Sequence, residues 1–235
     1  MRAAKAGTTG IEMLKTISWM AVLDQGVVDV WRIPLDGAVE RHLRVLSAAE
    51  RARVERRCGL QRDRFVIAHG AMREVLGVYL NCAPAFVPLT VRHGEPPRTL
   101  GLKISLSHSE DLALLAVSRA TVGVDVEHVS AAQDGDLDEV AELTLSPGEL
   151  AVFRGSRMVD RPRVWLRSWT RKEAVVKAHR DALAERAISD LDVLEGTVQH
   201  LTVEDLDVGP RHVAALAAAQ PPRQIVLRAW ADEPA

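Results

Sequence analysis

Two carboxylates lie two positions apart in the stretch Val-Gly-Val-Asp-Val-Glu, residues 122–127. Apolar and acidic residues alternate after the glycine, and because the side chains of a strand alternate between its faces, Asp125 and Glu127 are expected to point to the same side. Like charges at this spacing repel, and a divalent cation, a bound basic group or a raised pKa on one carboxyl relieves the repulsion. The wet face of a surface strand also carries acidic residues, so this motif alone indicates either a charged site or a solvated face.

A glutamate and two lysines recur in Trp-Leu-Arg-Ser-Trp-Thr-Arg-Lys-Glu-Ala-Val-Val-Lys, residues 165–177. The period of a helix places Trp169, Glu173 and Lys177 on one stripe, with Lys172 on its flank. A glutamate four positions before a lysine forms an ordinary helix pair worth about 0.2 to 0.5 kcal/mol. The two tryptophans favour burial of one helix face, which would bring Glu173 and Lys177 to the edge of the core. A surface ion pair and a functional pair both remain open.

Hydroxyls and an imidazole end a third stretch, Ile-Ser-Leu-Ser-His-Ser at residues 104–109. Ser107, His108 and Ser109 offer hydrogen-bond donors to a phosphate, and a protonated histidine adds positive charge. A histidine at the end of a strand is equally compatible with an ordinary surface position.

Strands and helices follow one another around these motifs, which predicts an α+β chain. β-Branched and aromatic residues predict a strand over 27–35, and Ser47 with Glu50 forms a capping box for a basic helix through Arg57. Apolar residues at helical spacing predict a second helix over 62–80. Further helices are predicted to begin at Ser146, which is followed by Pro147 and Glu149, and to cover 163–184. The remaining predicted strands are 86–91, 104–109, 112–118, 121–127, 200–207, 211–219 and 223–230.

Residues 111–127 and residues 211–230 share one pattern, in which an apolar strand, a break and a second strand follow a helical region. Two unrelated α+β halves can look this similar by chance. If the echo is a true repeat, the fold consists of two similar lobes with a boundary near Arg119.

Composition excludes several classes of protein. The net charge of -2 and pI near 6.5 argue against a nucleic-acid binder. Cys58 and Cys82 resemble neither a secreted disulfide framework nor a metal motif. The apolar stretch 17–23 is short, lies between Lys15 and Asp24 and lacks a clear small-residue cleavage site, which argues against a signal peptide. No apolar run approaches the roughly 20 residues that span a bilayer. We expect a soluble cytoplasmic protein with neither nucleic-acid nor membrane partners.

The order of the three motifs resembles the signature of 4′-phosphopantetheinyl transferases of the surfactin-synthetase-activating (Sfp) type. In that family a hydrophobic-Ser-His-Ser strand precedes G-[VI]-D-[VI]-E and then [FW]-[ST]-x-K-E-[AS]-x-x-K, and this chain matches the last two at every specified position. The resemblance extends more weakly over VWRIPL, SAAERARVERR and RFVIAHGAMREVL, which are similar to the family's first strand and first two helices.

The resemblance implies an enzyme that moves the 4′-phosphopantetheine arm of coenzyme A to a serine of an acyl or peptidyl carrier protein. Adenosine 3′,5′-bisphosphate is released. It implies that Mg²⁺ is held by Asp125, Glu127 and Glu173, and hard oxygen ligands suit this ion. It also implies catalytic roles for Glu173, which accepts the proton of the attacking serine, and for Lys177, which neutralises the diphosphate.

Contacts to coenzyme A follow from the same resemblance. His108 and Ser107 correspond to contacts with the 3′-phosphate of coenzyme A, and Lys172 joins Lys177 on the diphosphate. Arg51 and Arg53 of the first basic helix are further candidates, although a solvated helix face explains these arginines equally well.

One position departs from the family's pattern. Where the family often has Gly-Lys-Pro, with its lysine on a coenzyme A phosphate, this chain has Gly94-Glu95-Pro96. Either Arg92 or Arg98 replaces that contact, or the affinity for the nucleotide is lower. The alternative function is therefore a non-catalytic module that binds coenzyme A or a carrier protein, and a third is a generic α+β protein with a wet acidic face. Which carrier protein or pathway is served is left open.

The fold that the resemblance implies is an α+β pseudo-twofold fold of two lobes. Each lobe is a small antiparallel sheet packed with helices, and coenzyme A binds in the cleft between the lobes. The expected divisions are a flexible leader over 1–18, an N-terminal lobe over 19–118 and a C-terminal lobe over 119–235. The length of the chain favours a monomer.

Overall fold

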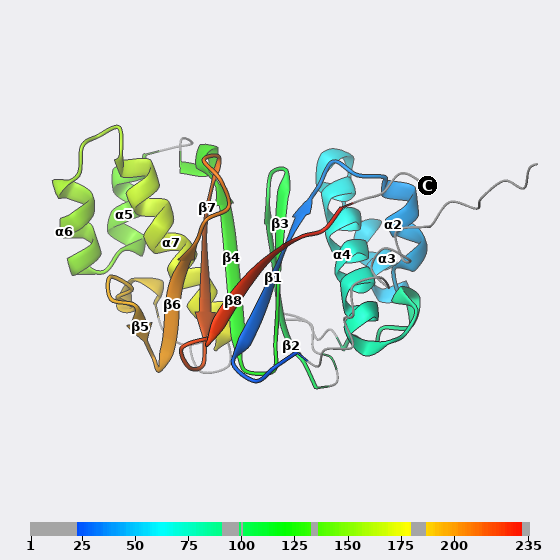
Figure 1. Ribbon diagram of the computed structural model, residues 1–235. Helices are drawn as coiled ribbons and strands as arrows, with labels where there is room; N and C mark the ends of the chain where they lie inside the picture. The colour runs from blue at the N-terminus through cyan, green and yellow to red at the C-terminus, as the bar shows by residue number, and fades with distance from the viewer. Residues whose placement is uncertain (1–22, 91–98, 100, 133–135, 180–186, 232–235) are drawn as a thin grey trace, which may run out of the picture. The chain divides into compact units, whose positions relative to one another are not determined.

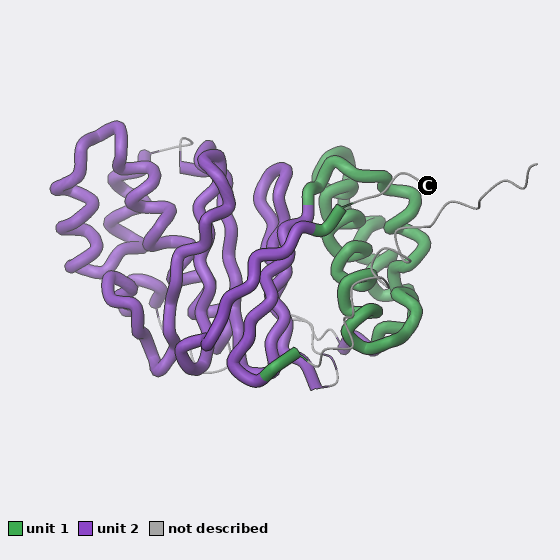
Figure 2. The backbone as a smooth tube through the Cα atoms, in the orientation of Figure 1, with its two compact units in different colours: residues 1–24, 34–87, 230–235 green, residues 25–33, 88–229 purple. Residues whose placement is uncertain are grey.

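Runs of helices and runs of strands follow one another along the chain, which is typical of an α+β protein (Figure 1). The computed structural model describes residues 23–90, 99, 101–132, 136–179 and 187–231. Contacts divide the chain into two units (Figure 2). We call residues 1–24, 34–87 and 230–235 the helical unit, and residues 25–33 with 88–229 the sheet unit.

In its described residues the helical unit contains the helices α2 (Val39–Val45), α3 (Ala48–Val54) and α4 (Gly59–Leu80), followed by the short helix η1 (Pro84–Phe86). The predicted capping box starts α3, because Ser47 and Glu50 each bond the other's backbone N–H. Leu46, Val54 and Phe65 lie in the core cluster of this unit. The two helices predicted for this region are confirmed. The strand predicted over 86–91 is wrong for its described residues 86–90, since η1 and an irregular segment lie there.

A buried charge network links α3 to α4. Glu50 is 2% exposed, accepts from Arg73 Nε at 2.6 Å and contacts His69 Nδ1 at 3.4 Å. Burial would raise the pKa of Glu50, but hydrogen bonds from His69 and Ser47 and the charge of Arg73 outweigh it and lower the pKa to about 2. The ionised form of Glu50 is therefore the form that stabilises the fold.

Acid should weaken the fold through Glu50. Its folded pKa lies below the unfolded value of 4.5, so its contribution is present above pH 4.5 and is lost as the pH falls towards 2. The contribution amounts to about 3 kcal/mol. Urea unfolding of the wild type and of Glu50→Gln from pH 6 to pH 3 should show a shallower pH dependence in the variant. Exposed Glu55→Gln is the control, and equal slopes for all three proteins would contradict the assignment.

Two four-stranded sheets form the sheet unit. Their strand orders are β2-β3-β1-β8 and β4-β7-β6-β5. The pairs β2–β3, β4–β7, β6–β7 and β5–β6 are antiparallel, and β1 pairs with β8 in parallel. The strands are β1 (Val27–Pro34), β2 (Lys103–Ser109), β3 (Leu112–Ser118), β4 (Val122–His128), β5 (Thr197–Val198), β6 (Leu201–Leu206), β7 (His212–Ala218) and β8 (Gln224–Ala229).

The order of elements repeats along the chain. Among the described elements, a strand, three α-helices and a hairpin run from β1 to β3, and a second strand, three α-helices and a hairpin run from β4 to β7. The orders β2-β3-β1 and β6-β7-β4 are equivalent. Each segment of the predicted echo, 111–127 and 211–230, passes from a strand of one sheet to a strand of the other. The α+β class with two small sheets is confirmed.

The predicted lobe limits remain a prediction. Contacts group residues 88–118 with the sheet unit, while the leader 1–18 lies outside the described residues.

Helices α5 (Leu137–Thr144), α6 (Pro147–Gly155) and α7 (Arg161–Ala178) belong to the sheet unit, with the short helices η2 (Val129–Ala132) and η3 (Ile188–Asp190). Helix α7 packs on β4 and β7 (Figure 1). Ala174 and Val175 meet Ala215 and Ala217 in one core cluster, while Leu216 faces a second cluster shared by both sheets. The helix predicted over 163–184 ends at Ala178, and 180–186 lie outside the described residues.

Helix α6 begins at the predicted cap, where Ser146 and Glu149 form a capping box and Pro147 occupies the first turn. Among the described helices, none is both long enough and apolar enough to cross a membrane.

Candidate functional site

A glycine allows the two acidic motifs to meet. Gly123 of β4 lies so close to α7 that a Cβ atom placed on it would come within 2.1 Å of the Ala174 carbonyl oxygen and 2.6 Å of the Ala178 nitrogen. Cβ atoms essentially never approach other atoms within 3.0 Å. The backbone of α7 can therefore reach the strand only where the side chain is a hydrogen atom. This contact brings Glu173 and Lys177 of α7 to the strand that carries the two carboxylates.

Asp125 lies at the centre of the site. It is 2% exposed, and its Oδ1 accepts from Lys177 Nζ at 2.5 Å and from Ser107 Oγ at 2.7 Å. Lys177 Nζ also donates to Ser107 Oγ at 2.8 Å. The second oxygen, Oδ2, is buried and has no hydrogen-bond partner among the described residues. Burial raises the pKa of Asp125, although the charge of Lys177 opposes that effect.

Glu127 lies on the same face of β4, half-buried, as the strand alternation predicts. Its Oε2 accepts from Ser109 Oγ at 2.8 Å. Burial raises its pKa, and the negative charges of Asp125 and Glu173 raise it further. The charges of Asp125 and Glu173 thus act on Glu127, although Asp125 shares β4 with Glu127 and Glu173 comes from α7.

Three serines of β2 bridge the two sheets. We call Ser105, Ser107 and Ser109 the serine seam. Ser105 Oγ accepts from the backbone N–H of Val124 at 3.0 Å, and Ser109 Oγ accepts from that of His128 at 3.0 Å. Ser107 and Ser109 also donate to the carboxylates, as described above. The seam fixes both carboxylates of β4 from the edge of the neighbouring sheet.

His108 and Ser107 point to opposite faces of β2. Alternation along β2 turns Ser105, Ser107 and Ser109 towards β4, so the exposed His108 points to the opposite face of the strand. The structure therefore does not aim Ser107 and His108 at one phosphate. Ser107 is occupied by Asp125 and Lys177 instead.

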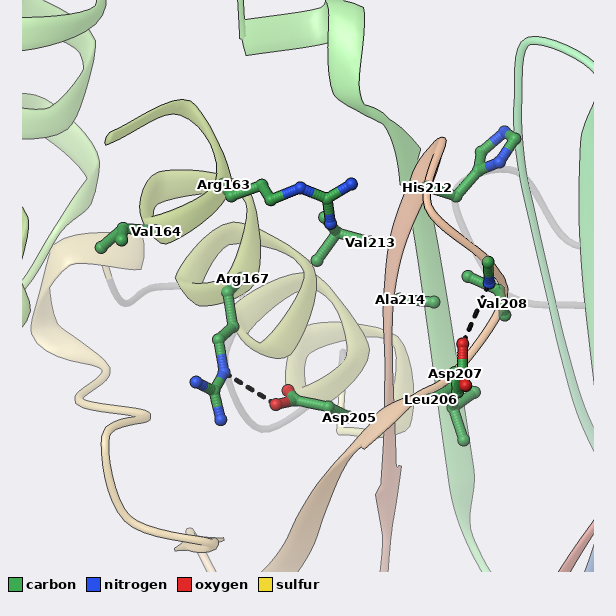
Figure 3. A pocket seen from close by; sticks show the side chains of 11 residues that line it. Arg163, Val164, Arg167, Asp205, Leu206, Asp207, Val208, His212, Val213 and Ala214 are labelled. Carbon is green, nitrogen blue, oxygen red and sulfur yellow. Dashed lines mark hydrogen bonds and ion pairs between the residues drawn. The ribbon is translucent and has the colours of Figure 1, made fainter. Parts of the chain in front are cut away.

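A cavity of about 370 Å³ lies elsewhere in the sheet unit, between α7 and the β6–β7 turn (Figure 3). Arg163 and Arg167 of α7 line it, and Arg167 Nε forms an ion pair with Asp205 Oδ2 at 2.7 Å. The described residues that line this cavity include none of the predicted site residues, so it is distinct from the carboxylate site.

Known proteins share the segment that carries this geometry. A sequence model described as the 4′-phosphopantetheinyl transferase superfamily matches residues 121–215. The 4′-phosphopantetheinyl transferase HetI of Nostoc sp. (strain PCC 7120) is 32% identical over 169 residues, which cover 67% of this chain and 70% of the relative. The chain belongs to the 4′-phosphopantetheinyl transferase superfamily. The matched residues 121–215 of this transferase include all of β4 and α7.

A crystal structure of the holo-[acyl-carrier-protein] synthase of Thermotoga maritima shows a weaker likeness. It is 22% identical with a TM-score of 0.35, and the match covers 43% of this chain and 63% of that one. A likeness of this level carries no argument about the site.

The predicted enzyme class is confirmed by the family. The transferase acts on a carrier protein with coenzyme A as the donor of phosphopantetheine, and the non-catalytic module is not favoured.

Lys172 does not occupy the place that the transferase motif suggested. Its side chain is fully buried, and Nζ lies 2.8 Å from Glu149 Oε2, 2.8 Å from the Thr144 carbonyl oxygen and 3.0 Å from the Ile188 carbonyl oxygen. An ammonium group has three donors, so none is left for a phosphate. The coenzyme A contact of Lys172 stays a prediction that this placement does not support, because the neighbours of Lys172 come from α5, α6 and η3.

Replacing Lys172 by methionine should destabilise the transferase by about 3 to 5 kcal/mol, because Glu149 stays buried without its counter-ion. Urea unfolding measures this loss. The exposed Lys103→Met is the control and should stay within about 0.5 kcal/mol of the wild type. Unchanged stability of Lys172→Met together with a raised KM for coenzyme A would restore the phosphate contact.

The remaining predicted contacts lie in the helical unit or outside the described residues. Arg51 donates to the carbonyl oxygens of Leu46 and Arg44 at 3.1 and 3.0 Å. Arg53 stacks its guanidinium over the ring of Phe65 at 4.9 Å. Their contacts with coenzyme A stay predictions. Residues 91–98, including Glu95 and the two arginines considered as its substitutes, are not described.

Sequence reasoning missed two functional features. It gave Gly123 no role in the packing of α7 against β4, and it did not predict that Ser105 and Ser109 contact β4. The period of two along residues 105–109 was the available signal, because it places all three serines on one face.

Proposed function

We propose that Asp125, Glu127 and Glu173 form a Mg²⁺ site at which the transferase moves the 4′-phosphopantetheine arm of coenzyme A to a carrier serine. The observation that carries this proposal is the buried Asp125, whose Oδ2 has no partner among the described residues. A buried carboxylate oxygen without a hydrogen bond is costly, and a cation removes that cost.

The donor set fits a hard divalent cation. All three side chains offer carboxylate oxygens, which Mg²⁺ prefers together with substrate phosphate and water. Burial raises the pKa values of Asp125 and Glu127, and the negative charges of Asp125 and Glu173 raise that of Glu127 further. When bound, the ion supplies electrostatic stabilisation of the diphosphate charge.

The chain's own residues bind the diphosphate and accept the proton of the carrier serine. Lys177 neutralises the diphosphate of coenzyme A as a point charge, and its ammonium is already held over the site by Asp125 and Ser107. The carrier serine oxygen forms a bond to the phosphorus that bears the pantetheine arm. The bond from this phosphorus to the bridging oxygen breaks, and adenosine 3′,5′-bisphosphate leaves. Half-buried Glu173 accepts the serine proton, directly or through a water.

Coenzyme A contacts are proposed for fewer residues than the family motif suggested. Exposed His108 remains a candidate for the 3′-phosphate, as do Arg51 and Arg53 for the nucleotide. Ser107 is assigned to positioning Asp125 and Lys177. Cytoplasmic location and a monomeric state stay predictions.

Transfer to a panel of apo carrier proteins tests the proposal. Purified protein with coenzyme A and Mg²⁺ should add the phosphopantetheine mass to at least one acyl or peptidyl carrier, as measured by mass spectrometry. Chelation with EDTA should stop the reaction and added Mg²⁺ should restore it. Full transfer after exhaustive chelation would contradict the metal site, whereas failure with every carrier and metal would contradict the transferase activity itself.

A further inference from the structure

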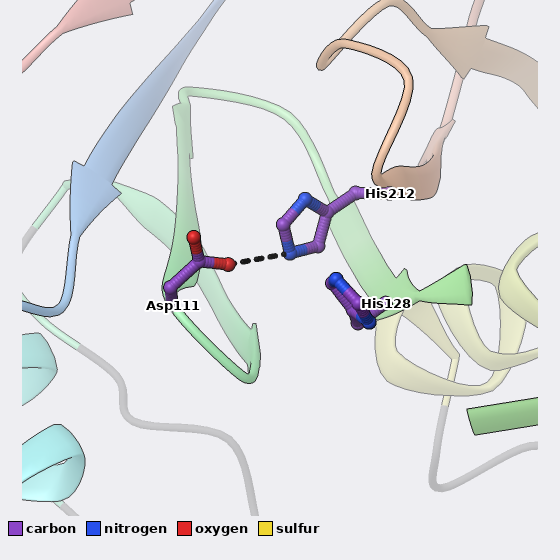
Figure 4. Close-up of side chains that lie close together, drawn as sticks. All are labelled: Asp111, His128 and His212. Carbon is purple, nitrogen blue, oxygen red and sulfur yellow. Dashed lines mark ion pairs between the residues drawn. The ribbon is translucent and has the colours of Figure 1, made fainter. Parts of the chain in front are cut away.

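A second group of metal-binding side chains lies at the C-terminal end of β4, next to the carboxylate site. One ligand atom each of Asp111, His128 and His212 lies within 4.8 Å of the others, and it is the group of this kind found among the described residues. Figure 4 shows the three side chains converging. Asp111 comes from the β2–β3 turn, His128 ends β4 and His212 begins β7.

The contact between Asp111 and His212 lacks a hydrogen bond. Asp111 Oδ1 and His212 Nε2 face each other at 3.2 Å, yet both atoms are buried without a hydrogen-bond partner. His212 forms a hydrogen bond with the backbone of Ser109, and this bond favours the protonated imidazole. The imidazole is therefore the donor, and the carbonyl oxygen of Ser109 accepts. Since Nε2 has no hydrogen bond, Nδ1 makes this one. With its proton on Nδ1, the neutral imidazole directs the lone pair of Nε2 at a carboxylate oxygen 3.2 Å away, and a cation between these two acceptors would satisfy both.

Neighbouring groups fix the orientation of each of the three side chains. His212 gives its other ring N–H to a backbone carbonyl, which is the usual arrangement of a metal-bound histidine. The backbone N–H of Ser130 donates to His128 Nδ1 at 3.2 Å, and Ser130 Oγ lies 2.8 Å from the same nitrogen, so both groups hold the imidazole ring in place. Arg211 holds the second oxygen of Asp111 at 2.7 Å, so Oδ1 stays directed at the imidazole.

We propose that Asp111, His128 and His212 form a second metal site, for Zn²⁺ or a similar transition ion. Two imidazoles and one carboxylate are ligands that suit Zn²⁺, whereas Mg²⁺ prefers oxygen alone. Zn²⁺ binds four ligands in tetrahedral geometry, so one position stays available for water. The ion ties the β2–β3 turn to the ends of β4 and β7, next to Glu127, and so fastens the end of β4 beyond the carboxylate site.

Calorimetric titration of chelator-treated protein with Zn²⁺ tests this site. We expect one equivalent bound tightly in the presence of excess Mg²⁺, together with a raised melting temperature. Asp111→Asn and His128→Gln should each weaken Zn²⁺ binding by about 100-fold or more, because even groups that only orient a ligand change affinity 10- to 100-fold. The two variants keep His212, which is buried, so the fold is disturbed least.

Two further variants test whether Zn²⁺ binds at this site and not at a surface histidine or at the carboxylate site. His200→Asn, an exposed histidine in left-handed backbone, serves as the matched control and should bind Zn²⁺ as the wild type does. Asp125→Asn should also keep the tight equivalent. Co²⁺ in place of Zn²⁺ should give the absorption bands of a four-coordinate site, and these should disappear in Asp111→Asn. Tight binding that survives in Asp111→Asn and His128→Gln, or that disappears in Asp125→Asn, would overturn the proposal.

Discussion

Replacing Glu173 by glutamine is expected to lower the rate of phosphopantetheine transfer by about 10²- to 10⁴-fold. Glutamine has nearly the same shape, but it cannot accept the serine proton and it removes one charge from the carboxylate group. Since Glu173 is half-buried at the edge of the core, the fold should be retained. The loss of charge should also lower the pKa of Glu127, whose value Glu173 now helps to raise.

Single-turnover transfer at several Mg²⁺ concentrations separates the two roles of Glu173. A role in holding the ion predicts that more Mg²⁺ partly restores the rate, whereas a role as proton acceptor predicts a loss that Mg²⁺ does not repair. Exposed Glu195→Gln is the control and should transfer at the wild-type rate. Near-normal turnover of Glu173→Gln with an unchanged requirement for Mg²⁺ would remove Glu173 from the site.

Replacing Gly123 by alanine should damage both stability and transfer. The new Cβ would lie 2.1 Å from the Ala174 carbonyl oxygen, and both contacts are to backbone, so α7 has to move away from β4. Overpacking of this kind typically costs about 1 to 3 kcal/mol. A shift of about 1 Å in the helix that carries Glu173 and Lys177 can by itself reduce the rate about 10²-fold.

Urea unfolding and the transfer rate measure the two effects of Gly123→Ala. The matched control is Gly155→Ala at the end of α6, where an added Cβ meets nothing within 4 Å. This control should be neutral or slightly stabilising. If Gly123→Ala behaved like Gly155→Ala, the close approach of α7 would not be what brings the site together.

Local periodicity predicted much of the fold and part of the site. Alternation placed Asp125 and Glu127 on one face of a strand, because that rule depends only on neighbouring residues. Helix α3 was predictable from its capping box for the same reason. The pairing of β4 with β7 was not predictable, because Asp125 lies opposite Ala215, 90 positions away. Helices α2 and α5 are short, and they were not predicted.

The ion-pair partners of Lys172 and Lys177 show most clearly what the sequence alone does not predict. The helical spacing suggested that Lys177 pairs with Glu173, but its Nζ lies 2.5 Å from Asp125 on a distant strand. Lys172 shares the same motif yet points into the core to Glu149. A sequence shows which residues share a face of α7, but which face meets β4 and which meets α6 depends on tertiary packing. The roles of the two lysines could therefore not be separated in advance.

The serine seam has a consequence for the behaviour of the protein in concentrated solution. β2 and β4 are each the outermost strand of their sheet, and such strands offer unpaired N–H and carbonyl groups to the strands of other molecules. Ser105 and Ser109 already occupy the N–H groups of Val124 and His128. A strand of another molecule that approaches this edge of β4 therefore cannot accept a hydrogen bond from these two N–H groups. The hydroxyls that position the carboxylates thus also guard the protein against edge-to-edge aggregation.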